Sequence, residues 1–356
     1  MKKLMVLIAA CALALAAQAE GLCWLQTSHD FGAFSENLVE VETDFKFVND
    51  TAEPVMITQV ASSCGCTVPS YDTDAVAPGD TATIKVKFNA IGRPGRFTKH
   101  VYVRTTANHD RTRLTINGVV IGNASTISTR YPVDRGPLKF EHGAAMVGKV
   151  NARSIKSTFV DIYNQSHDSL RLEFANVPEF ITIGVNPEAL PPGEMSVLNV
   201  FFNAATANEY GIVTDSVQIS VQPGGPTFFF PVVGIVEEDF SKLTPEQLAS
   251  APQVVIVGDR FDLGKVPLGS TNTVEASIEV QNQGKNPLII RRAYSQDPAI
   301  SVRVDKNEIK HGKKAKITVT FDPSTQPSGL INSRITIITN DPSQPTRSIR
   351  VVGERK

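Results

Sequence analysis

The cysteines of this 356-residue chain are the residues whose type and spacing could do chemistry. Cys64-Gly65-Cys66 places two thiols two positions apart, inside the segment Ser-Ser-Cys-Gly-Cys-Thr at 62–67. The other two cysteines, Cys11 and Cys23, lie near the N-terminus. Thiols this close together can form a disulfide, exchange electrons or bind a soft metal ion.

Three interpretations of these cysteines stay open at the level of the sequence. Cys23 could bridge to Cys64 or Cys66, which would tie the N-terminus to the first domain and leave one thiol over. A Cys64–Cys66 disulfide would close a small strained ring, and strain makes such a bond labile and redox-active. Two thiolates on one loop also suit copper(I) or zinc, with His29 and Cys23 as further ligands. We predict Cys23, Cys64 and Cys66 as disulfide or redox residues, with no metal and no cofactor, because no second cysteine pair completes a zinc set.

The first 19 residues have the features of a secretory signal peptide. Lys2 and Lys3 supply the basic start, residues 4–16 the apolar stretch, and Ala-Gln-Ala at 17–19 the cleavage site. The apolar stretch is shorter than the roughly 20 residues that a membrane span needs. Residues 8–11 resemble a lipoprotein box, but Cys11 is followed by further apolar sequence. We expect an exported protein without a membrane span, in the periplasm or at the cell surface of a Gram-negative bacterium.

Charge is unevenly distributed, although the formal net charge is only −1. Between Asp259 and Lys356 there are 16 basic and 10 acidic residues. The densest basic run consists of Lys310, Lys313, Lys314 and Lys316. This run either contacts an anionic partner, such as a polysaccharide or a lipid headgroup, or is a solvated strand end. We expect no nucleic-acid partner, because the positive charges are not interleaved with exposed aromatic residues.

The elements that must position these residues repeat three times along the chain. A glycine is followed nine residues later by phenylalanine at 79–88, 193–202 and 312–321, so the copies begin 114 and 119 residues apart. Ahead of each copy, a segment with alternating apolar residues ends in asparagine, at Asn49, Asn164 and Asn282. This alternation is typical of strands with one buried face. A period of this length corresponds to one domain.

We therefore predict an all-β fold of three tandem immunoglobulin-like antiparallel β-sandwiches, because two half-buried sheets of this length pack face to face. The expected boundaries are a signal peptide at 1–19, sandwiches at 20–123, 124–238 and 253–356, and a linker at 239–252. No copy shows helical periodicity. Within the linker, Thr-Pro-Glu-Gln at 244–247 has a capping threonine and an N1 proline, which predicts a short helix through about Ser250.

Several motifs of the first domain carry a family resemblance. They are Phe31-Gly32, Phe47-x-Asn49, Ser63-Cys64-Gly65-Cys66-Thr67, Pro78-Gly79 and Gly95-x-Phe97-x-Lys99. Together they resemble a bacterial domain-of-unknown-function family, common in exported proteins of Bacteroidota and similar to the ASH/Hydin class of immunoglobulin-like domains. The resemblance covers about residues 28–108, and the later domains share only the strand and turn skeleton. It implies an immunoglobulin-like sandwich and an envelope location, and it supplies no activity.

Motifs typical of enzymes are absent from the sequence. There is no Gly-x-Ser-x-Gly elbow, His-Glu-x-x-His helix or Gly-x-x-x-x-Gly-Lys loop. We therefore predict a non-catalytic envelope protein that acts as an interaction or scaffold module through sandwich loops and edge strands. Its expected partner is a protein or glycan of the cell envelope. The alternative is a thiol-redox or soft-metal-handling protein that uses Cys64 and Cys66.

Overall fold

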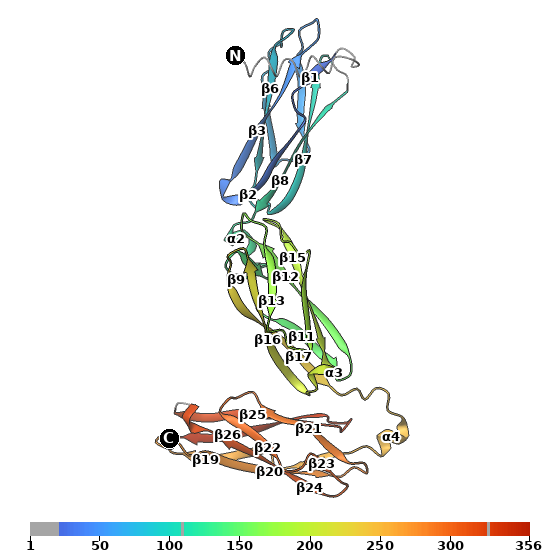
Figure 1. The fold of residues 1–356 in the computed structure, drawn as a ribbon, viewed down its shortest axis with the longest axis vertical. Coiled ribbons are helices and arrows are strands. Elements are labelled where there is room, and N and C mark those ends of the chain that lie inside the picture. The colour runs from blue at the N-terminus through green and yellow to red at the C-terminus, as the bar shows by residue number, and fades with distance from the viewer. Residues whose placement is uncertain (1–20, 108–109, 326–327) are drawn as a thin grey trace.

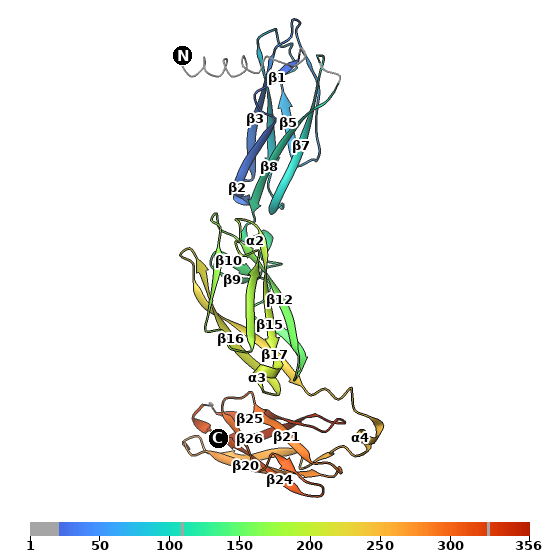
Figure 2. The ribbon, with the colours of Figure 1, turned by 45° about the vertical axis from the view of Figure 1, so that its right-hand side comes forward.

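The computed structural model describes residues 21–107, 110–325 and 328–356. The predicted signal peptide and Cys11 lie outside the described residues. Three β-sandwiches follow one another along the chain, as Figures 1 and 2 show. The first two are stacked end to end, and the third lies across the end of the second. The predicted all-β fold of three tandem immunoglobulin-like sandwiches is confirmed.

The first sandwich packs two four-stranded sheets, in the orders β1-β3-β6-β5 and β2-β8-β7-β4. Large side chains such as Phe45, Phe47 and Phe88 are completely buried between them. Its elements are β1 (Leu22–Trp24), β2 (Ser28–Ser35), η1 (Glu36–Leu38), β3 (Glu40–Asn49), β4 (Ile57–Ser62), β5 (Thr67–Tyr71), β6 (Thr81–Asn89), β7 (Gly95–Thr105) and β8 (Thr112–Ile121).

The second sandwich has a five-stranded sheet, β14-β15-β12-β10-β9, and a four-stranded sheet, β11-β17-β16-β13. Phe140, Phe202 and Phe230 fill its core. Its elements are α2 (Ala124–Ile127), β9 (Val133–Arg135), β10 (Leu138–Phe140), β11 (Ala145–Asn151), β12 (Ile155–Asn164), β13 (Arg171–Ala175), β14 (Ile181–Asn186), β15 (Met195–Asn203), α3 (Ala204–Ala207), β16 (Gly211–Gln222) and β17 (Thr227–Glu237).

The third sandwich combines sheets β18-β20-β24-β22 and β19-β26-β25-β21-β23 around Phe261 and Phe321. Its elements, with the linker helix that precedes it, are α4 (Pro245–Ala249), β18 (Val254–Val257), β19 (Arg260–Val266), β20 (Val274–Asn282), β21 (Leu288–Ser295), β22 (Ile300–Val304), β23 (Glu308–Ile309), β24 (Lys314–Phe321), η2 (Pro323–Thr325), β25 (Gly329–Thr339) and β26 (Thr346–Arg355).

The helices are short and are held by their N-terminal caps. The predicted linker helix is present as α4, with a complete capping box between Thr244 and Gln247. The single-turn helices α2 and α3 were not expected from periodicity. Each begins after an asparagine, Asn123 or Asn203, whose side chain accepts a hydrogen bond from the first turn. A capped single turn shows no apolar repeat, so the sequence pattern cannot reveal it.

Each sandwich contains one parallel strand pair among its antiparallel pairs. The pairs are β2 with β8, β11 with β17, and β19 with β26. In every case a strand near the start of the domain lies beside the strand that ends it. Alternation along a strand gives its buried face and not the direction of its neighbour, so these pairs were not predictable from the sequence.

The three repeated asparagines form the same buried network in each sandwich. Nδ2 of Asn49 donates to the carbonyls of Glu53 (2.9 Å) and Val76 (2.8 Å), and its Oδ1 accepts from the Thr51 amide at 3.0 Å. Asn164 and Asn282 each donate two equivalent bonds, and all three asparagines are 0% exposed. Each asparagine therefore joins the turn that follows it to a second chain segment at least 26 residues away.

The glycines of the repeat complete this network. The backbone carbonyls of the three asparagines accept hydrogen bonds from the amides of Gly79, Gly193 and Gly312 at 2.8–2.9 Å. These glycines have φ values of +83°, +67° and +67°, a left-handed conformation that other residues rarely adopt. The repeated Gly-to-Phe spacing therefore encodes a turn closed on the asparagine, followed by a strand that ends in a core phenylalanine.

Direct contacts join the first sandwich to the second. The Gly122 amide donates to the Tyr163 hydroxyl at 2.8 Å, and the Gln165 side chain donates to the Gly122 carbonyl at 2.9 Å. Arg96 forms an ion pair with Glu194 across the same joint. Specific polar contacts therefore join the first two domains.

Candidate functional site

The Cys64-Gly65-Cys66 segment lies at a corner between the two sheets of the first sandwich. β4 is the edge strand of one sheet and β5 is the edge strand of the other. Residues 63–66 cross from the end of β4 to the start of β5. The corner is therefore flanked on both sides by strands that lack a neighbour on their outer side.

Hydrogen bonds fix this corner to both sheets. On the side of β7, the Ser63 amide donates to the His100 carbonyl at 2.8 Å, and the His100 amide donates to Ser63 Oγ at 3.0 Å. On the side of β6, the Asn89 amide donates to the Cys66 carbonyl at 2.9 Å. The Cys64 carbonyl accepts from Ser62 Oγ at 2.8 Å. The backbone around the two cysteines is thus held in place independently of their sulfur atoms.

The two sulfur atoms lie at bonding distance in the structure. Cys64 Sγ and Cys66 Sγ are 2.08 Å apart, with their Cα atoms separated by 5.3 Å. Cys66 is buried at 8% exposure, whereas Cys64 is half-buried, so Cys64 is the sulfur that a solute reaches first. The buried hydroxyl of Thr67 lies 3.5 Å from Cys64 Sγ and 4.0 Å from Cys66 Sγ. This hydroxyl can donate a hydrogen bond to either sulfur.

Cys23 does not take part in this pair, and its position argues against a bridge from Cys23 to Cys64 or Cys66. Cys23 lies on β1, opposite Val48 of β3. In the sheet order β1-β3-β6-β5, the strands β1 and β5 are at opposite edges. Three strand spacings separate them by roughly 14 Å, whereas bridged cysteines need Cα atoms within about 7 Å. The sequence could not reveal this separation because it does not give strand order.

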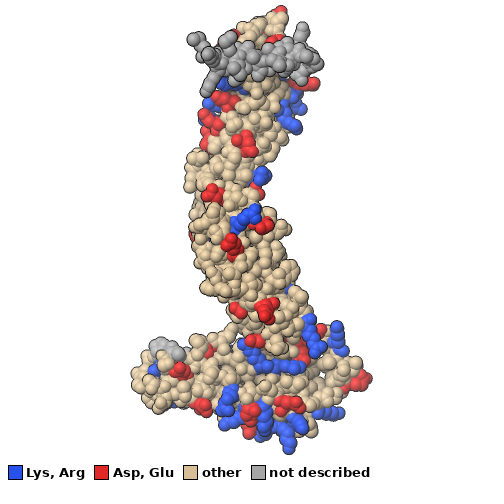
Figure 3. All heavy atoms as spheres, in the orientation of Figure 1, with Lys and Arg blue, Asp and Glu red and all other residues tan. Residues whose placement is uncertain are grey.

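The possible metal ligands are also dispersed. The His29 ring packs against Phe31, with centroids 4.6 Å apart. Within residues 21–107, 110–325 and 328–356, no three His, Cys, Asp or Glu side chains are grouped so that they could hold a metal ion. In the basic run of the third sandwich, Lys314 pairs with Glu279 at 2.7 Å. Figure 3 shows Lys and Arg side chains gathered over the third sandwich, with Asp and Glu among them.

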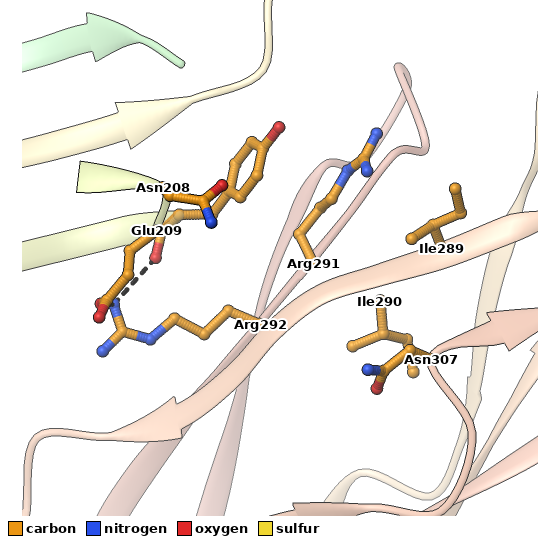
Figure 4. Close-up of a pocket in the computed structure, with 8 residues that line it drawn as sticks. Asn208, Glu209, Ile289, Ile290, Arg291, Arg292 and Asn307 are labelled. Carbon is orange, nitrogen blue, oxygen red and sulfur yellow. Dashed lines mark hydrogen bonds and ion pairs between the residues drawn. The ribbon is translucent and has the colours of Figure 1, made fainter. Parts of the chain in front are cut away.

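A cavity of about 420 Å³ lies between the second and third sandwiches, and Figure 4 shows two arginines of β21 beside it. Arg291 forms two hydrogen bonds with the Glu238 carboxylate, at 2.7 and 3.0 Å. Arg292 pairs with Glu209 at 2.8 Å and donates to two backbone carbonyls of the second sandwich at 3.1 Å. Because both guanidinium groups already bind carboxylates, this cavity is a structural joint and does not present free charge to an anion.

The candidate site therefore combines a pair of sulfur atoms with a backbone that is hydrogen-bonded to both sheets. Sequence reasoning located the cysteines, and it missed Thr67 as their neighbour and Ser63 as their anchor to β7. The order Ser-Cys-Gly-Cys-Thr was visible, but which side chains point toward the sulfurs depends on the turn. None of the helices among the described residues has the length and apolar composition of a membrane span.

The fold defines the class of the molecule as a tandem array of immunoglobulin-like sandwiches. Residues 22–120 match the family described as "Protein of unknown function (DUF1573)". Residues 252–354 match the family described as "HYDIN/CFA65/VesB-like, Ig-like domain". The first match confirms the resemblance of the first domain to a family of unknown function. The second match places the Hydin-type immunoglobulin-like similarity on the third domain, for which the sequence indicated only the strand and turn skeleton. Neither family description includes an enzymatic activity.

The solved structures that match this chain are distant from it in sequence. A protein of unknown function from Porphyromonas gingivalis W83 is 22% identical, with 62% of this chain and all of that chain covered and a TM-score of 0.49. An I-band fragment of titin, I67–I69, is 12% identical over 96% of this chain and 99% of its own, with a TM-score of 0.25. An endo-fucoidan hydrolase of glycoside hydrolase family 107 is 10% identical over 88% of this chain and 42% of its own, at 0.27. No curated protein matches the chain.

Proposed function

We propose that this chain is a non-catalytic exported protein of the cell envelope that acts as an interaction or scaffold module. The observation that carries the proposal is the construction of the molecule. Three sandwiches are joined at specific polar contacts, and each sandwich offers loops and open edge strands. An open edge strand can pair with an extended segment of another molecule through its backbone. The proposed partner is a protein or glycan of the envelope.

A site-specific photocrosslinking experiment tests this proposal. A photoreactive residue replaces Val68 on edge strand β5, or Thr182 on edge strand β14, in the full chain expressed in its native host. Thr83 of the central strand β6 is the matched control. We expect discrete adducts at one of the edge positions and none at Thr83. Adducts that are equal at all three positions, or a turnover of substrate by the purified protein, would contradict a scaffold that works through its edges.

A second candidate function is thiol–disulfide exchange at Cys64 and Cys66. The observation that favours it is the position of the sulfur pair, with the half-buried Cys64 at a corner between two edge strands. A thiolate of a dithiol reductant would attack Cys64, and Cys66 would leave as a thiolate. The second thiol of the reductant would then release Cys64 and form the reductant's own disulfide.

Mass spectrometry of alkylated cysteines separates the two candidates. The exported protein is alkylated with and without prior equilibration against glutathione or dithiothreitol. A Cys64–Cys66 bond that opens at a potential near that of the oxidising compartment supports exchange. A bond that stays closed under those conditions, with no effect of Cys64→Ser on partner adducts, leaves the cysteines a structural role within the scaffold.

A further inference from the structure

The second sandwich has an apolar outer face where the other two sandwiches have polar ones. Ile155 and Phe159 on β12 are 64% and 66% exposed, and Phe201 on the neighbouring strand β15 is 47% exposed. In the strand register, Ser157 lies opposite Phe201, so Ile155 and Phe159 are its diagonal neighbours. These three side chains form one cluster because diagonal pairs on a sheet are within reach of aromatic side chains. We call this cluster the apolar face.

The repeats within the chain provide an internal comparison for the apolar face. Counting back from the buried asparagine of each copy, Ile155 and Phe159 correspond to Glu40 and Asp44 in the first sandwich. Counting back from the core phenylalanine, Phe201 corresponds to Lys87. In the first sandwich these positions form an ion-pair ladder, with Lys87 2.9 Å from Glu40.

The third sandwich is also polar at these positions. Thr273, Ser277 and Thr320 take the places of Ile155, Phe159 and Phe201. The same strand pair can therefore be solvated by charged or hydroxyl side chains, and the fold does not require apolar residues there. Exposed aromatic residues at such positions of one copy only are typical of a contact surface.

We infer that the apolar face is the self-association surface of this protein and that its occupant is the same face of a second copy. The three side chains of the apolar face are uncharged, and the next outward carboxylate along β12, Asp161, pairs with Arg130 at 2.8 Å. An uncharged apolar face is complementary to itself. The surface of the face is also uneven. The rings of Phe159 and Phe201 protrude, and the small residues Ser157 and Gly184 beside them leave hollows. A two-fold axis in the plane of contact would place the rings of each copy over the hollows of the other.

The size of the apolar face indicates a weak, reversible dimer. The three side chains of the cluster expose roughly 350 Å² of surface. Two copies would bury roughly 700 Å², below the about 1,200 Å² at which stable interfaces begin. The expected dissociation constant is therefore on the order of 10–100 µM.

Charge complementarity selects the orientation of the two copies. Residues 20–123 have 9 basic and 12 acidic residues, whereas residues 259–356 have 16 basic and 10 acidic residues. A two-fold axis across the middle sandwich, perpendicular to the chain direction, runs the copies antiparallel. The basic third domain of one copy then approaches the acidic first domain of the other. Association should therefore weaken as salt rises.

Analytical ultracentrifugation tests the inference on the full chain without its predicted signal peptide. We expect a monomer–dimer equilibrium between about 1 and about 500 µM protein, and about a tenfold or greater weakening by Phe159→Lys or Phe201→Lys. Phe229→Lys is the matched control, because Phe229 is 61% exposed on β17 of the opposite sheet. It should leave the equilibrium unchanged.

Two results would overturn the inference. One is a wild-type chain that remains monomeric throughout this concentration range. The other is a dimer that Phe159→Lys and Phe229→Lys affect equally. Circular dichroism and thermal unfolding of each variant confirm that it is folded, which is expected because both replaced rings are exposed. A scaffold that binds only other molecules would remain monomeric here and still form adducts at Val68 on β5 of the first sandwich. Thr182 lies opposite Phe201 on the apolar face, so adducts at Val68 are the ones that distinguish a failure of this inference from a failure of the proposed function.

Discussion

At the scale of single residues, the most consequential side chain of the fold is the buried asparagine at the end of one strand in each sandwich. These strands are β3, β12 and β20. In the first sandwich the asparagine side chain satisfies two carbonyls and one amide that would otherwise be unpaired in the interior. An unpaired buried carbonyl costs about 1–3 kcal/mol. The sequence showed this residue three times, but only the structure explains why the strand always ends in asparagine.

Replacement of this residue in the first sandwich is readily measured. Asn49→Ala removes both donors and should lower the free energy of unfolding of that sandwich by about 2–4 kcal/mol. Trp24, the single tryptophan of the chain, packs against Phe47 in the same domain and reports its unfolding in urea. The exposed Asn37 is the control, and Asn37→Ala should have little effect. Equal midpoints for the two variants would refute this role of Asn49.

Glu36 is a second residue with a role that the sequence did not reveal. It is 2% exposed and accepts hydrogen bonds from the Gly92 amide, the Asn123 amide and the Thr126 hydroxyl at 2.6–2.9 Å. Burial on its own would raise the pKa of this carboxyl, but the three hydrogen bonds outweigh it and lower the pKa below its ordinary value of 4.5. The carboxylate therefore fastens the end of the first sandwich to α2.

This lowered pKa predicts loss of stability in acid. A carboxyl whose pKa is lower in the folded state stabilises the protein above its unfolded pKa, and this contribution disappears as pH falls through the folded pKa. Unfolding of the first sandwich, followed by Trp24 fluorescence, should become easier below pH 4.5. Glu36→Gln should cost about 1–3 kcal/mol at neutral pH and flatten this dependence. An unchanged pH profile in Glu36→Gln would assign the acid sensitivity to other carboxyls.

At the scale of elements, one turn of the repeat serves two different purposes. Gly193 and Gly312 have the same φ of +67° and the same hydrogen bond to their asparagine carbonyls. A Cβ at Gly312 would meet nothing within 4 Å, whereas a Cβ at Gly193 would lie 2.8 Å from Val119 of the preceding sandwich. In the second sandwich, the turn is therefore also a contact surface for the first.

Alanine at these two glycines separates backbone strain from steric clash. Gly312→Ala should cost about 1–2 kcal/mol, the penalty of a left-handed alanine. Gly193→Ala adds the clash with Val119 and should cost about 2–4 kcal/mol in total. Hydrogen exchange of β16 and β25 reports the opening of the second and third sandwiches respectively. Similar losses of hydrogen-exchange protection in the two variants would show that the contact with Val119 adds no free-energy cost to Gly193→Ala.

The sequence predicts elements well where one residue pattern determines them. Alternation identified the core strands, and Thr244 with Gln247 identified the linker helix. The positions of Cys23 and Cys64 at opposite edges of the first sandwich were not predictable, because pairing order depends on contacts between distant segments. Phe159 lies on the side of β12 that the alternation assigns to solvent, so its exposure was predictable. The pairing that brings Phe201 of β15 beside it was not.

At the scale of the whole molecule, the joint between the second and third sandwiches fixes the bend seen in Figure 1. Beyond the two arginine contacts, the Tyr294 hydroxyl accepts from the Ile212 amide at 3.0 Å, and Arg292 stacks over the Tyr294 ring at 4.3 Å. Arg292 therefore binds a carboxylate, two carbonyls and an aromatic ring at once. Arg292 and Arg291 together therefore connect the third sandwich to the second sandwich and to the segment that follows it.

Removal of both arginines should loosen the bend. In the double variant Arg291→Ala and Arg292→Ala, small-angle X-ray scattering should show a broader distance distribution and a larger maximum dimension. The control with the same change in charge is Arg303→Ala with Arg334→Ala, at two exposed positions of the third sandwich. Scattering curves that coincide for the two double variants would show that other contacts hold the domains.

The parallel strand pairs have a mechanical consequence for a chain that is held at both ends. Once the short strands that come first in each sandwich (β1, β9 and β10, or β18) have detached, tension passes into β2, β11 or β19 and leaves through β8, β17 or β26. Each of these strands is bonded to its exit strand in parallel. Pulling such a pair from opposite ends loads its hydrogen bonds in shear, so that they resist together instead of opening one after another. The molecule is therefore built to resist extension along its chain, with each sandwich as a separate element in series.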